Sequence, residues 1–412
     1  MLKGTHKKNA FFLWMMAITT FTVAIPASAA TLLVGPTRTY KTPCAAILAA
    51  SDGDTILIDP VTYMNDTCAF TTNNLTIQGV LGPNGERPDI DDSGLTGNGS
   101  AGHLAQYKAI FVPKGANTVI KNIEFSNASI PKKFGNNGAG IRQDGTNLTV
   151  LNCKFDHDQD GILESNIAGS NIVIQFTEFA FNGAGDGQSH NLYIGHSASL
   201  LFAFNYSHDA NVGHLLKTRA AVNYVLYNRL TGENGTDSYE IDIPNGGTSY
   251  VIGNLVQQGP NTQNFAMLSY MEEGASSLNP GSDLYVVNNS IVNQYPSGGI
   301  FVQVGSADAT PALLQNNIFD GPGTITTQAN AIFKTNFTGD PMFVDVDNFD
   351  YHLTSGSPAI NTGSQPTSAN DFSLAPKDEY VHPACGQQRF PVGIIDIGAY
   401  EFGDGGAMLQ CR

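Results

Sequence analysis

Short apolar runs recur along the middle of the chain, from about residue 70 to about residue 320. In each unit a β-branched run meets an asparagine, a second apolar run follows, and a turn of Gly, Asn or Asp closes the unit. The units start about 23 to 35 residues apart, a period that indicates stacked supersecondary units. Representative copies are TVIKNIEFSNA from Thr118, LTVLNCKFDHD from Leu148, LLFAFNYSHDA from Leu200 and LYVVNNSIVNQ from Leu284.

A second set of short strands lies between many of these copies and opens with Gly-Ile, as at Gly140, Gly161 and Gly299. No helical pattern between the runs is long enough for a βαβ crossover, and the two-residue turns that antiparallel hairpins need are scarce. The pattern therefore predicts a coil of parallel strands, with each turn about 4.8 Å from the previous one. Asparagine amides at equivalent turns are expected to hydrogen-bond up and down the stack.

Two end segments resemble a known superfamily. Residues 44–63, CAAILAASDGDTILIDPVTY, predict a short amphipathic helix, a Gly-Asp turn and a first strand. They closely resemble the N-terminal cap of bacterial secreted right-handed parallel β-helix proteins of the pectate-lyase-like superfamily, with Val61 where that pattern usually has glycine. YHLTSGSPAINTG from Tyr351 and IDIGAYEF from Ile395 resemble the C-terminal end of secreted members of the same superfamily.

The repeats and the resemblance together predict an all-β fold, a right-handed parallel β-helix (solenoid) with a short N-terminal capping helix. Such a helix would shield the open apolar end and the unpaired strand edge of the first coil. The resemblance is to a polysaccharide-lyase-like member. It does not fix the reaction, because the same coil carries lyases, hydrolases, epimerases, esterases and plain binding proteins.

The domain organisation follows from these segments. Residues 1–29 predict a signal peptide, with Lys3, Lys7 and Lys8 ahead of an apolar stretch at 11–25 and small residues at 27–29. A single domain is expected over 30–402, with the N-terminal cap at about 40–63, coils at about 70–345, a C-terminal closing segment at 346–402 and a tail at 403–412. No later stretch has the length of a membrane span. We therefore expect a secreted protein, extracellular or periplasmic, and a monomer because both ends are capped.

Composition and charge narrow the classes of function. Charged residues make up only 14% of the chain, and the net charge of −16 becomes −19 once the three lysines of the signal peptide are removed. Nucleic acid is excluded as a partner, because phosphate binding needs a basic surface. The 5 cysteines indicate bridges in an oxidising compartment. Spacing alone does not fix their connectivity; one bridge near each end is expected, Cys44–Cys68 and Cys385–Cys411, with Cys153 left as a buried thiol.

Two residue distributions point to one region of the coil. Lys and Arg almost vanish between residues 155 and 333, where only Lys217, Arg219 and Arg229 remain. Lys217 and Arg219 stand at i and i+2 in GHLLKTRA, a spacing that puts both cations on one face of a strand. Histidines gather in the same region, at His157, His190, His196, His208 and His214.

The period sets an expected register between coils. If Leu192, Leu216 and Ile241 are equivalent inward positions, Tyr193, Lys217 and Asp242 become outward neighbours on successive coils. A register slip of one residue would turn two cations into a narrow apolar interior, which is unfavourable. The remaining members of this outer face are expected to be Arg219 and Glu240 as flanking residues, Arg142 two coils earlier, His190 and His214 at the strand starts, and His208 and Asp209 in the turns.

This face suits a polysaccharide substrate. The lyases of this fold abstract the C5 proton of a uronic acid with a Lys, Arg, His or Tyr while a cation neutralises the adjacent carboxylate. GHLLKTRA is loosely similar to the catalytic strand of alginate- and chondroitin-type β-helix lyases, without their Arg-His-Gly order. The roles implied are Lys217 with Arg219 as base, His214, Tyr193 or His190 as acid or alternative base, Arg142, His208, Asp209 and Tyr239 as substrate-binding residues, and Glu240 with Asp242 as ligands of a Ca²⁺ that bridges to the substrate.

Three alternatives stay open at this stage. The cations and acids of the face would equally form a cross-strand salt-bridge ladder with no catalytic role. A glycoside hydrolase of the same fold would use paired carboxylates, for which the candidates are Asp186, Asp209, Asp237, Glu240 and Asp242. A non-catalytic carbohydrate-binding or adhesion protein would line a groove with exposed aromatic residues, for which the candidates are Tyr206, Tyr224, Tyr227, Tyr239 and Tyr270.

Overall fold

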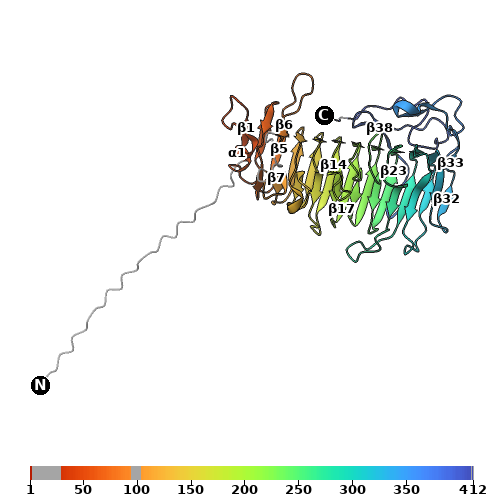
Figure 1. Ribbon diagram of the computed structural model, residues 1–412, viewed down its shortest axis with the longest axis horizontal. Helices are drawn as coiled ribbons and strands as arrows, with labels where there is room; N and C mark the ends of the chain where they lie inside the picture. Colours follow the sequence, from red (N-terminus) through yellow and green to blue (C-terminus); the bar gives the residue numbers. More distant parts are fainter. Residues whose placement is uncertain (2–28, 94–103, 410, 412) are drawn as a thin grey trace.

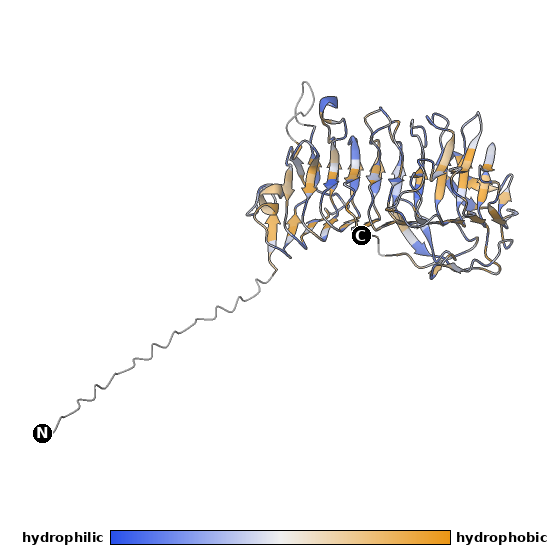
Figure 2. Ribbon diagram, turned by 90° about the horizontal axis from the view of Figure 1, so that it is seen from below, coloured by the Kyte–Doolittle hydropathy of each residue, from blue (hydrophilic) through white to orange (hydrophobic). Residues whose placement is uncertain are grey.

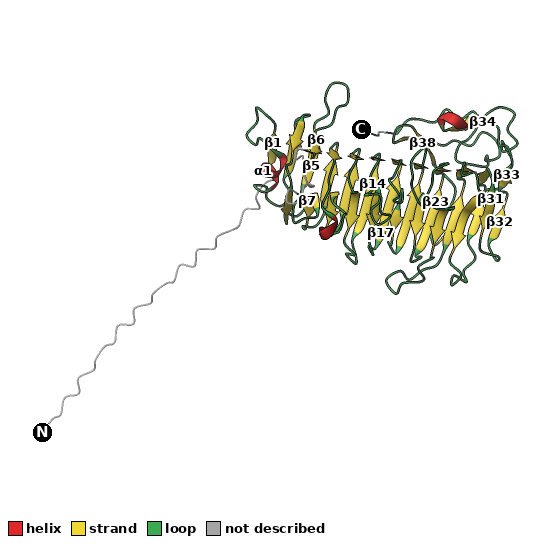
Figure 3. Cartoon of the chain, viewed as in Figure 1, coloured by secondary structure: helices red, strands yellow, loops and turns green. Residues whose placement is uncertain are grey.

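The chain winds into one long coil in which each turn contributes a strand to each of three parallel sheets (Figure 1). The computed structural model describes residues 1, 29–93, 104–409 and 411, so the predicted signal peptide lies almost entirely outside the described residues. Strands and loops make up nearly all of the described chain, with three short helical segments (Figure 3). The expected all-β, right-handed parallel β-helix is confirmed. No helix among the described residues has the length and apolarity that a membrane crossing needs.

The three sheets contain 12, 11 and 10 strands and are called here sheets A, B and C in the order in which each coil visits them. Sheet A consists of β1 (Thr31–Val34), β2 (Thr55–Ile58), β5 (Thr76–Gly79), β8 (Thr118–Lys121), β11 (Leu148–Leu151), β14 (Asn171–Gln175), β17 (Ser199–Ala203), β20 (Val222–Leu226), β23 (Thr248–Ile252), β26 (Leu284–Val287), β29 (Leu313–Gln315) and β32 (Ile332–Lys334). Sheet B consists of β3 (Thr62–Met64), β6 (Asp89–Asp91), β9 (Glu124–Ser126), β12 (Lys154–Asp156), β15 (Glu178–Ala180), β18 (Tyr206–His208), β21 (Arg229–Thr231), β24 (Leu255–Gln258), β27 (Ser290–Asn293), β30 (Ile318–Asp320) and β33 (Phe337–Thr338). Sheet C consists of β4 (Cys68–Phe70), β7 (Ala109–Pro113), β10 (Ala139–Gln143), β13 (Asp160–Glu164), β16 (Leu192–Ile194), β19 (Lys217–Thr218), β22 (Ile241–Ile243), β25 (Ala266–Tyr270), β28 (Gly299–Val304) and β31 (Gly323–Thr326).

Apolar side chains at equivalent positions of successive coils stack inside the coil. Phe125, Phe155 and Phe179 pair directly in sheet B, and their rings stack with centroids 5.2 and 5.0 Å apart. Inward and outward residues alternate along the strands because successive side chains point to opposite faces, and apolar and polar colours share the same strands in Figure 2. The interior is therefore a continuous packed core that offers no room for a substrate, and any functional site lies on an outer face.

A buried asparagine ladder runs through the turn between sheets A and B. The backbone N–H and the side-chain amide of Asn228 both donate to Asn254 Oδ1, at 2.9 Å each. The Asn228 amide also donates to the carbonyl of Phe202, at 2.8 Å. The same contacts repeat from coil to coil, so every amide in the ladder holds two neighbouring turns in register. The members of the ladder are Asn205, Asn228, Asn254, Asn289, Asn317 and Asn336.

Helix α1 (Pro43–Ile47) covers the first coil, where Ala46 and Ile47 are fully buried in the core. The expected disulfides Cys44–Cys68 and Cys385–Cys411 are both present, and Cys153 is a buried free thiol. The two other helical segments are the 3₁₀ turns η1 (Lys132–Phe134) and η2 (Val346–Asn348).

The C-terminal segment does not close the far end of the coil, in contrast to the expectation for residues 346–402. It folds back along the side of the coil towards the N-terminal turns (Figure 1). There Tyr351 and Tyr380 pack on the outer face of sheet B against Tyr206 and Leu255, while Phe333 of the last coil stays 50% exposed. Apolar side chains on the outer face of sheet B let the segment bury its own apolar residues away from water. Its strands are β34 (Phe343–Asp345), β35 (Asp350–Leu353), β36 (Ser368–Ala369), β37 (Phe372–Ser373), β38 (Asp378–Val381) and β39 (Cys385–Gln388).

Replacement of Asn254 by Ala tests the ladder. The variant removes the Oδ1 acceptor of the Asn228 backbone N–H and the amide that donates to the Val225 carbonyl. Each buried polar group without a partner costs about 1–3 kcal/mol, so we expect the free energy of unfolding to fall by about 3 kcal/mol. Urea denaturation followed by circular dichroism measures it. Asn171→Ala, an exposed asparagine at a strand start, is the control and should change stability by less than about 0.5 kcal/mol; equal effects of the two variants would contradict the role of the ladder.

Candidate active site

The outer face of sheet C carries the expected row of polar side chains. Tyr193 of β16 pairs with Lys217 of β19, and Lys217 pairs with Asp242 of β22. The predicted register of these three residues is therefore confirmed. Leu192, Leu216 and Ile241, the residues that precede them, are fully buried in the core, as expected. The period of two along each strand thus directs the phenol, the ammonium and the carboxylate outward on adjacent coils.

Ion pairs and hydrogen bonds join the members of this row. Lys217 Nζ lies 3.1 Å from Asp242 Oδ2 and 3.7 Å from Glu273 Oε1. Arg219 lies two residues after Lys217, on the same face, and its Nε donates to the hydroxyl oxygen of Tyr193 at 2.7 Å. Glu273 Oε2 lies 2.7 Å from the Arg219 guanidinium, which also donates to Asn245. The side chains of Lys217 and Asp242 are only 12% and 5% exposed, so this pair is largely shielded from water.

Two neighbouring carboxyl groups respond to these cations differently. The Arg219 hydrogen bond lowers the pKa of Glu273, which remains ionised. Burial raises the pKa of Asp242, and the charge of Lys217 opposes that rise only in part. Asp242 is therefore a carboxyl group that takes up a proton more readily than an exposed aspartate does.

A column of rings lies beside the row, at the start of the same strands. His190 and His214 stack with centroids 4.3 Å apart, and His214 lies 5.0 Å from the ring of Tyr239. His190 also touches the edge of the Tyr193 ring, at 5.9 Å. Both histidines are buried, and burial lowers the pKa of His190 to about 3 and that of His214 well below its ordinary value. Neither imidazole is charged at neutral pH.

A shallow groove of about 360 Å³ extends the face towards the N-terminal coils. Arg142 and Tyr193 both line it, together with Asp160, Ser165 and Gln188. The Arg142 guanidinium donates to Ser165 at 2.8 Å and lies 3.4 Å from Asp144. Arg142, Tyr193 and Tyr239 thus lie on the same face as Lys217, as expected, although their roles toward a substrate stay predictions.

The expected position of Glu240 on the outer face of sheet C is wrong. Strand β22 begins only at Ile241, so the alternation that directs Asp242 outward does not extend back to Glu240. Glu240 instead occupies the position of Leu215 and Met267 on the neighbouring coils, both of which are buried in the core. Its carboxyl group is fully buried and contacts that of Asp237, and neither group has another side-chain partner among the described residues. Glu240 and Asp242 therefore do not form the expected Ca²⁺ site.

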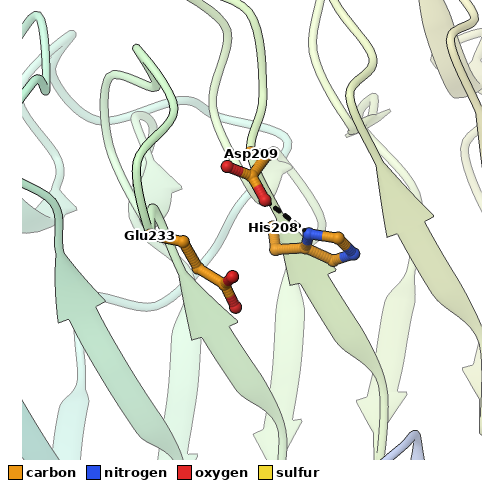
Figure 4. Close-up of side chains that lie close together, drawn as sticks. All are labelled: His208, Asp209 and Glu233. Carbon is orange, nitrogen blue, oxygen red and sulfur yellow. Dashed lines mark hydrogen bonds and ion pairs between the residues drawn. The ribbon is translucent and has the colours of Figure 1, made fainter. Parts of the chain in front are cut away.

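His208 and Asp209 also lie apart from the row. His208 ends strand β18 of sheet B, and Asp209 begins the turn that leads away from that sheet. The two side chains are linked by a 2.7 Å hydrogen bond, with Glu233 of the next coil beside them (Figure 4). The expectation that they share the face of Lys217 is wrong. The sequence does not show how sharply the chain turns between sheets B and C, and this turn separates the two faces.

His208, Asp209 and Glu233 bring one ligand atom each within 4.8 Å of one another, so they are a possible metal site. Their surroundings do not suit Ca²⁺, which prefers six or more oxygen ligands. Glu233 Oε1 already accepts hydrogen bonds from Tyr206 at 2.5 Å and from Arg229 at 2.6 Å. Burial opposes protonation of His208, but hydrogen bonds to Asp209 and Glu178 raise its pKa above the ordinary value. A hydrogen-bonded ion-pair network accounts for the group as it stands.

Two members of the site, Glu273 and Asn245, lie outside the strand repeat from which the row was predicted. Glu273 belongs to a loop after β25, outside the repeated strand pattern, and it bridges Lys217 and Arg219. Asn245 follows β22 and holds the Arg219 guanidinium. Asn245 lies two residues past the end of β22, where the alternation along a strand no longer indicates which way a side chain points.

Comparisons with known proteins support the fold. No protein-family model matches the chain, and no curated protein does. Among solved structures, the crystal structure of pectate lyase Pel9A matches 91% of this chain and 97% of its own, with a TM-score of 0.51 and 14% sequence identity. The PL6 family alginate lyase AlyGC matches 75% of this chain and 51% of its own, with a TM-score of 0.36 and 12% identity. The likeness to Pel9A shows that this chain has the pectate-lyase-like parallel β-helix fold.

The buried pair of Asp237 and Glu240 predicts a pH dependence of stability. Burial raises the pKa of Asp237 to about 7 and that of Glu240 well above its ordinary value. The folded protein therefore keeps protons that the unfolded chain releases above about pH 4, and stability falls as the pH rises from about 4 to 7. In Glu240→Gln an amide donates to Asp237, so we expect this fall to be smaller by on the order of 1–3 kcal/mol.

Urea unfolding of both proteins at a series of pH values measures the difference. Glu272→Gln, an exposed neighbour in sequence of Glu273, is the matched control and should follow the wild-type curve. Parallel curves for Glu240→Gln and the wild type would show that the two buried carboxyl groups hold no extra proton.

Proposed function

We propose that the protein is a secreted polysaccharide lyase that cleaves a uronic-acid-containing polymer by β-elimination on the outer face of sheet C. The observation that carries the proposal is the convergence of Tyr193, Lys217 and Arg219 from adjacent coils beside an open groove. The two disulfides support export to an oxidising compartment. Elimination needs a base, a cation for the carboxylate and a proton donor for the leaving oxygen, and this face offers all three.

Lys217 acts as the base. It first passes its proton to Asp242 Oδ2, 3.1 Å away, a carboxyl group whose pKa burial has raised. The neutral amine then takes the C5 proton of the uronate, and the electrons of the C5–H bond form the C4–C5 double bond as the C4–O bond breaks. The Tyr193 hydroxyl donates its proton to the leaving oxygen, and the Arg219 guanidinium, 2.7 Å from that hydroxyl, stabilises the phenolate that results.

The arginines of the face neutralise the substrate carboxylates, because Lys217 is neutral when it takes the C5 proton. Arg219 and Lys217 already hold the carboxylate of Glu273 between them. Arg142, in the groove two coils before Tyr193, is placed to bind a second acidic unit of a polymer that runs along the coil axis. A chain with a net charge of −16 would otherwise repel an acidic polymer, so these local cations are what makes such a substrate compatible with the surface.

The placement of the carboxylates argues against the hydrolase alternative. Asp237 and Glu240 are buried inside the coil, Asp209 is bonded to His208 at the edge of sheet B, and Asp242 is paired with Lys217. Asp186 lies on an exposed turn, where it accepts a hydrogen bond from Asn136. No two of these five candidates face each other across an open groove in the described part of the chain, as a glycosidase pair has to.

The tyrosines argue against a plain binding protein. Tyr270 is fully buried, and Tyr206 and Tyr227 are 8% and 7% exposed. Tyr224 is covered by Phe372 of the C-terminal segment, with ring centroids 5.0 Å apart. Of the five candidates only Tyr239 lies at the proposed site, so they do not form the exposed aromatic platform that such a protein uses.

Replacement of Lys217 tests the reaction. We expect the wild type to release unsaturated sugars from pectate, alginate or chondroitin, detected by the ultraviolet absorbance of the new double bond. Lys217→Ala should lose about 10²–10⁴-fold in rate because the base is gone, with an unchanged circular dichroism spectrum. Lys154→Ala is the matched control, since Lys154 also pairs with two carboxylates on an outer face but belongs to sheet B. Wild-type turnover by Lys217→Ala would refute the assignment, and reducing ends without absorbance would indicate hydrolysis.

Chelation tests the expected Ca²⁺. Because Glu240 is buried and Asp242 is bonded to Lys217, we propose that the cations of the face, and not a metal ion, neutralise the substrate carboxylate. Turnover should then stay within about twofold after removal of divalent ions and dialysis, a change of less than about 0.5 kcal/mol in the barrier. If turnover is lost, and is restored by Ca²⁺ but not by Mg²⁺, the reaction requires a bound Ca²⁺ and this proposal is wrong.

A further inference from the structure

The backbone of the next coil fixes the tautomer of each stacked histidine. The backbone N–H of His214 donates to His190 Nδ1 at 3.0 Å, and that of Tyr239 donates to His214 Nδ1 at 3.3 Å. A backbone N–H can only donate, so both Nδ1 atoms are acceptors and carry no proton. The ring proton of each neutral imidazole therefore resides on Nε2.

The surroundings of His190 keep the ring neutral. His214 stacks on one side of it and Tyr193 meets its edge on the other. The charged groups that act on it are Lys217 and Arg219, which oppose protonation, and Asp186, which favours it more weakly than burial opposes it. Asp160 Oδ1 accepts a hydrogen bond from the His190 backbone N–H at 2.8 Å and so is not a partner of the ring.

The Nε2 atoms of the two rings have different partners. His214 Nε2 lies 3.6 Å from Asp242 Oδ2, the carboxyl group that also holds Lys217. His190 Nε2 has no hydrogen-bond partner among residues 29–93, 104–409 and 411. The ring lies between Tyr193 and the stacked His214, on the face that Lys217 occupies. His190 is only 3% exposed, so its Nε2–H is a largely buried, unpaired donor next to the proposed base and proton donor.

We propose that His190 is a neutral hydrogen-bond donor to the substrate, which it contacts through Nε2–H, and that it is neither a general acid nor a general base. This inference rests on the proposed function. As the C5 proton leaves, negative charge develops on the uronate carboxylate, and a fixed N–H donor stabilises that charge without any reorganisation. The histidine transfers no proton, so its contribution does not vary with pH over the working range of the enzyme.

Nuclear magnetic resonance of the unliganded protein tests the tautomer without any substrate. With ¹⁵N-labelled histidine, the ring nitrogens of His190, assigned by comparison with His190→Asn, should show protonated Nε2 and unprotonated Nδ1 from pH 5 to 8. A titration of the ring within that range, or a proton on Nδ1, would overturn the proposal. Because no turnover is measured, this result stands apart from the success or failure of the lyase assignment.

Two variants at the same position test the donor. In His190→Asn the side-chain oxygen still accepts the His214 N–H, but the outward donor is absent; in His190→Gln an amide N–H reaches the place of Nε2. We expect His190→Asn to lose about 10²-fold in kcat, as removal of one such donor does, with a nearly unchanged KM and the same loss at every pH from 5 to 8. His190→Gln should recover part of it.

The control is His196→Asn, at a histidine near the same sheet whose Nδ1 lies 3.2 Å from Asn279 Oδ1; it should keep wild-type kcat. A loss of kcat in His190→Asn that changes with pH would show an acid or base role. An equal loss in the Asn and Gln variants, or no loss in either, would show that the outward N–H does not contact the substrate. If the wild type has no lyase activity, the variant experiment fails with the proposed function, while the tautomer is still decided by the resonance measurement.

Discussion

The asparagine ladder between sheets A and B is the constraint on which the arrangement of the outer faces depends. Each buried amide bonds to the backbone and the side chain of the next coil, so a shift of one coil by a single residue would leave several buried polar groups without partners. The ladder lies one sheet away from Tyr193, Lys217 and Asp242, yet it fixes how their strands align. Without this register, side chains 24 and 25 positions apart in sequence would not meet.

The parts of the fold that could be predicted from the sequence are those that depend on a repeated local rule. The period of the repeat and the alternation within a strand are such rules, and they placed Tyr193, Lys217 and Asp242 in one outward row, as observed. Both disulfides were also predicted correctly; each joins two cysteines 24 or 26 residues apart near one end of the chain. Glu240 was misplaced because alternation holds only inside a strand, and the strand starts one residue later.

Features that depend on turns and long-range packing could not be predicted in the same way. His208 ends a strand of sheet B, and only the angle of the following turn separates it from the face of Lys217. The C-terminal segment has apolar residues that become buried on folding. The sequence does not show whether they pack on the open end of the coil or on the side of sheet B. Glu273 reaches the site from a loop, where no periodicity indicates which way a side chain points.

The position of Glu273 shows how an acidic protein can present a site for an acidic polymer. Its carboxylate is half exposed and lies between Arg219, at 2.7 Å, and Lys217, at 3.7 Å, which are themselves largely shielded. An exposed ion pair of this kind is worth only about 0–1 kcal/mol, so a substrate carboxylate that replaces Glu273 gives up little. The attraction between these shielded cations and a bound uronate is stronger than the attraction to Glu273, because it acts where water is excluded. Glu273 thus keeps Lys217 and Arg219 paired in the free protein. Because this ion pair is weak, an acidic polymer can displace it at little cost.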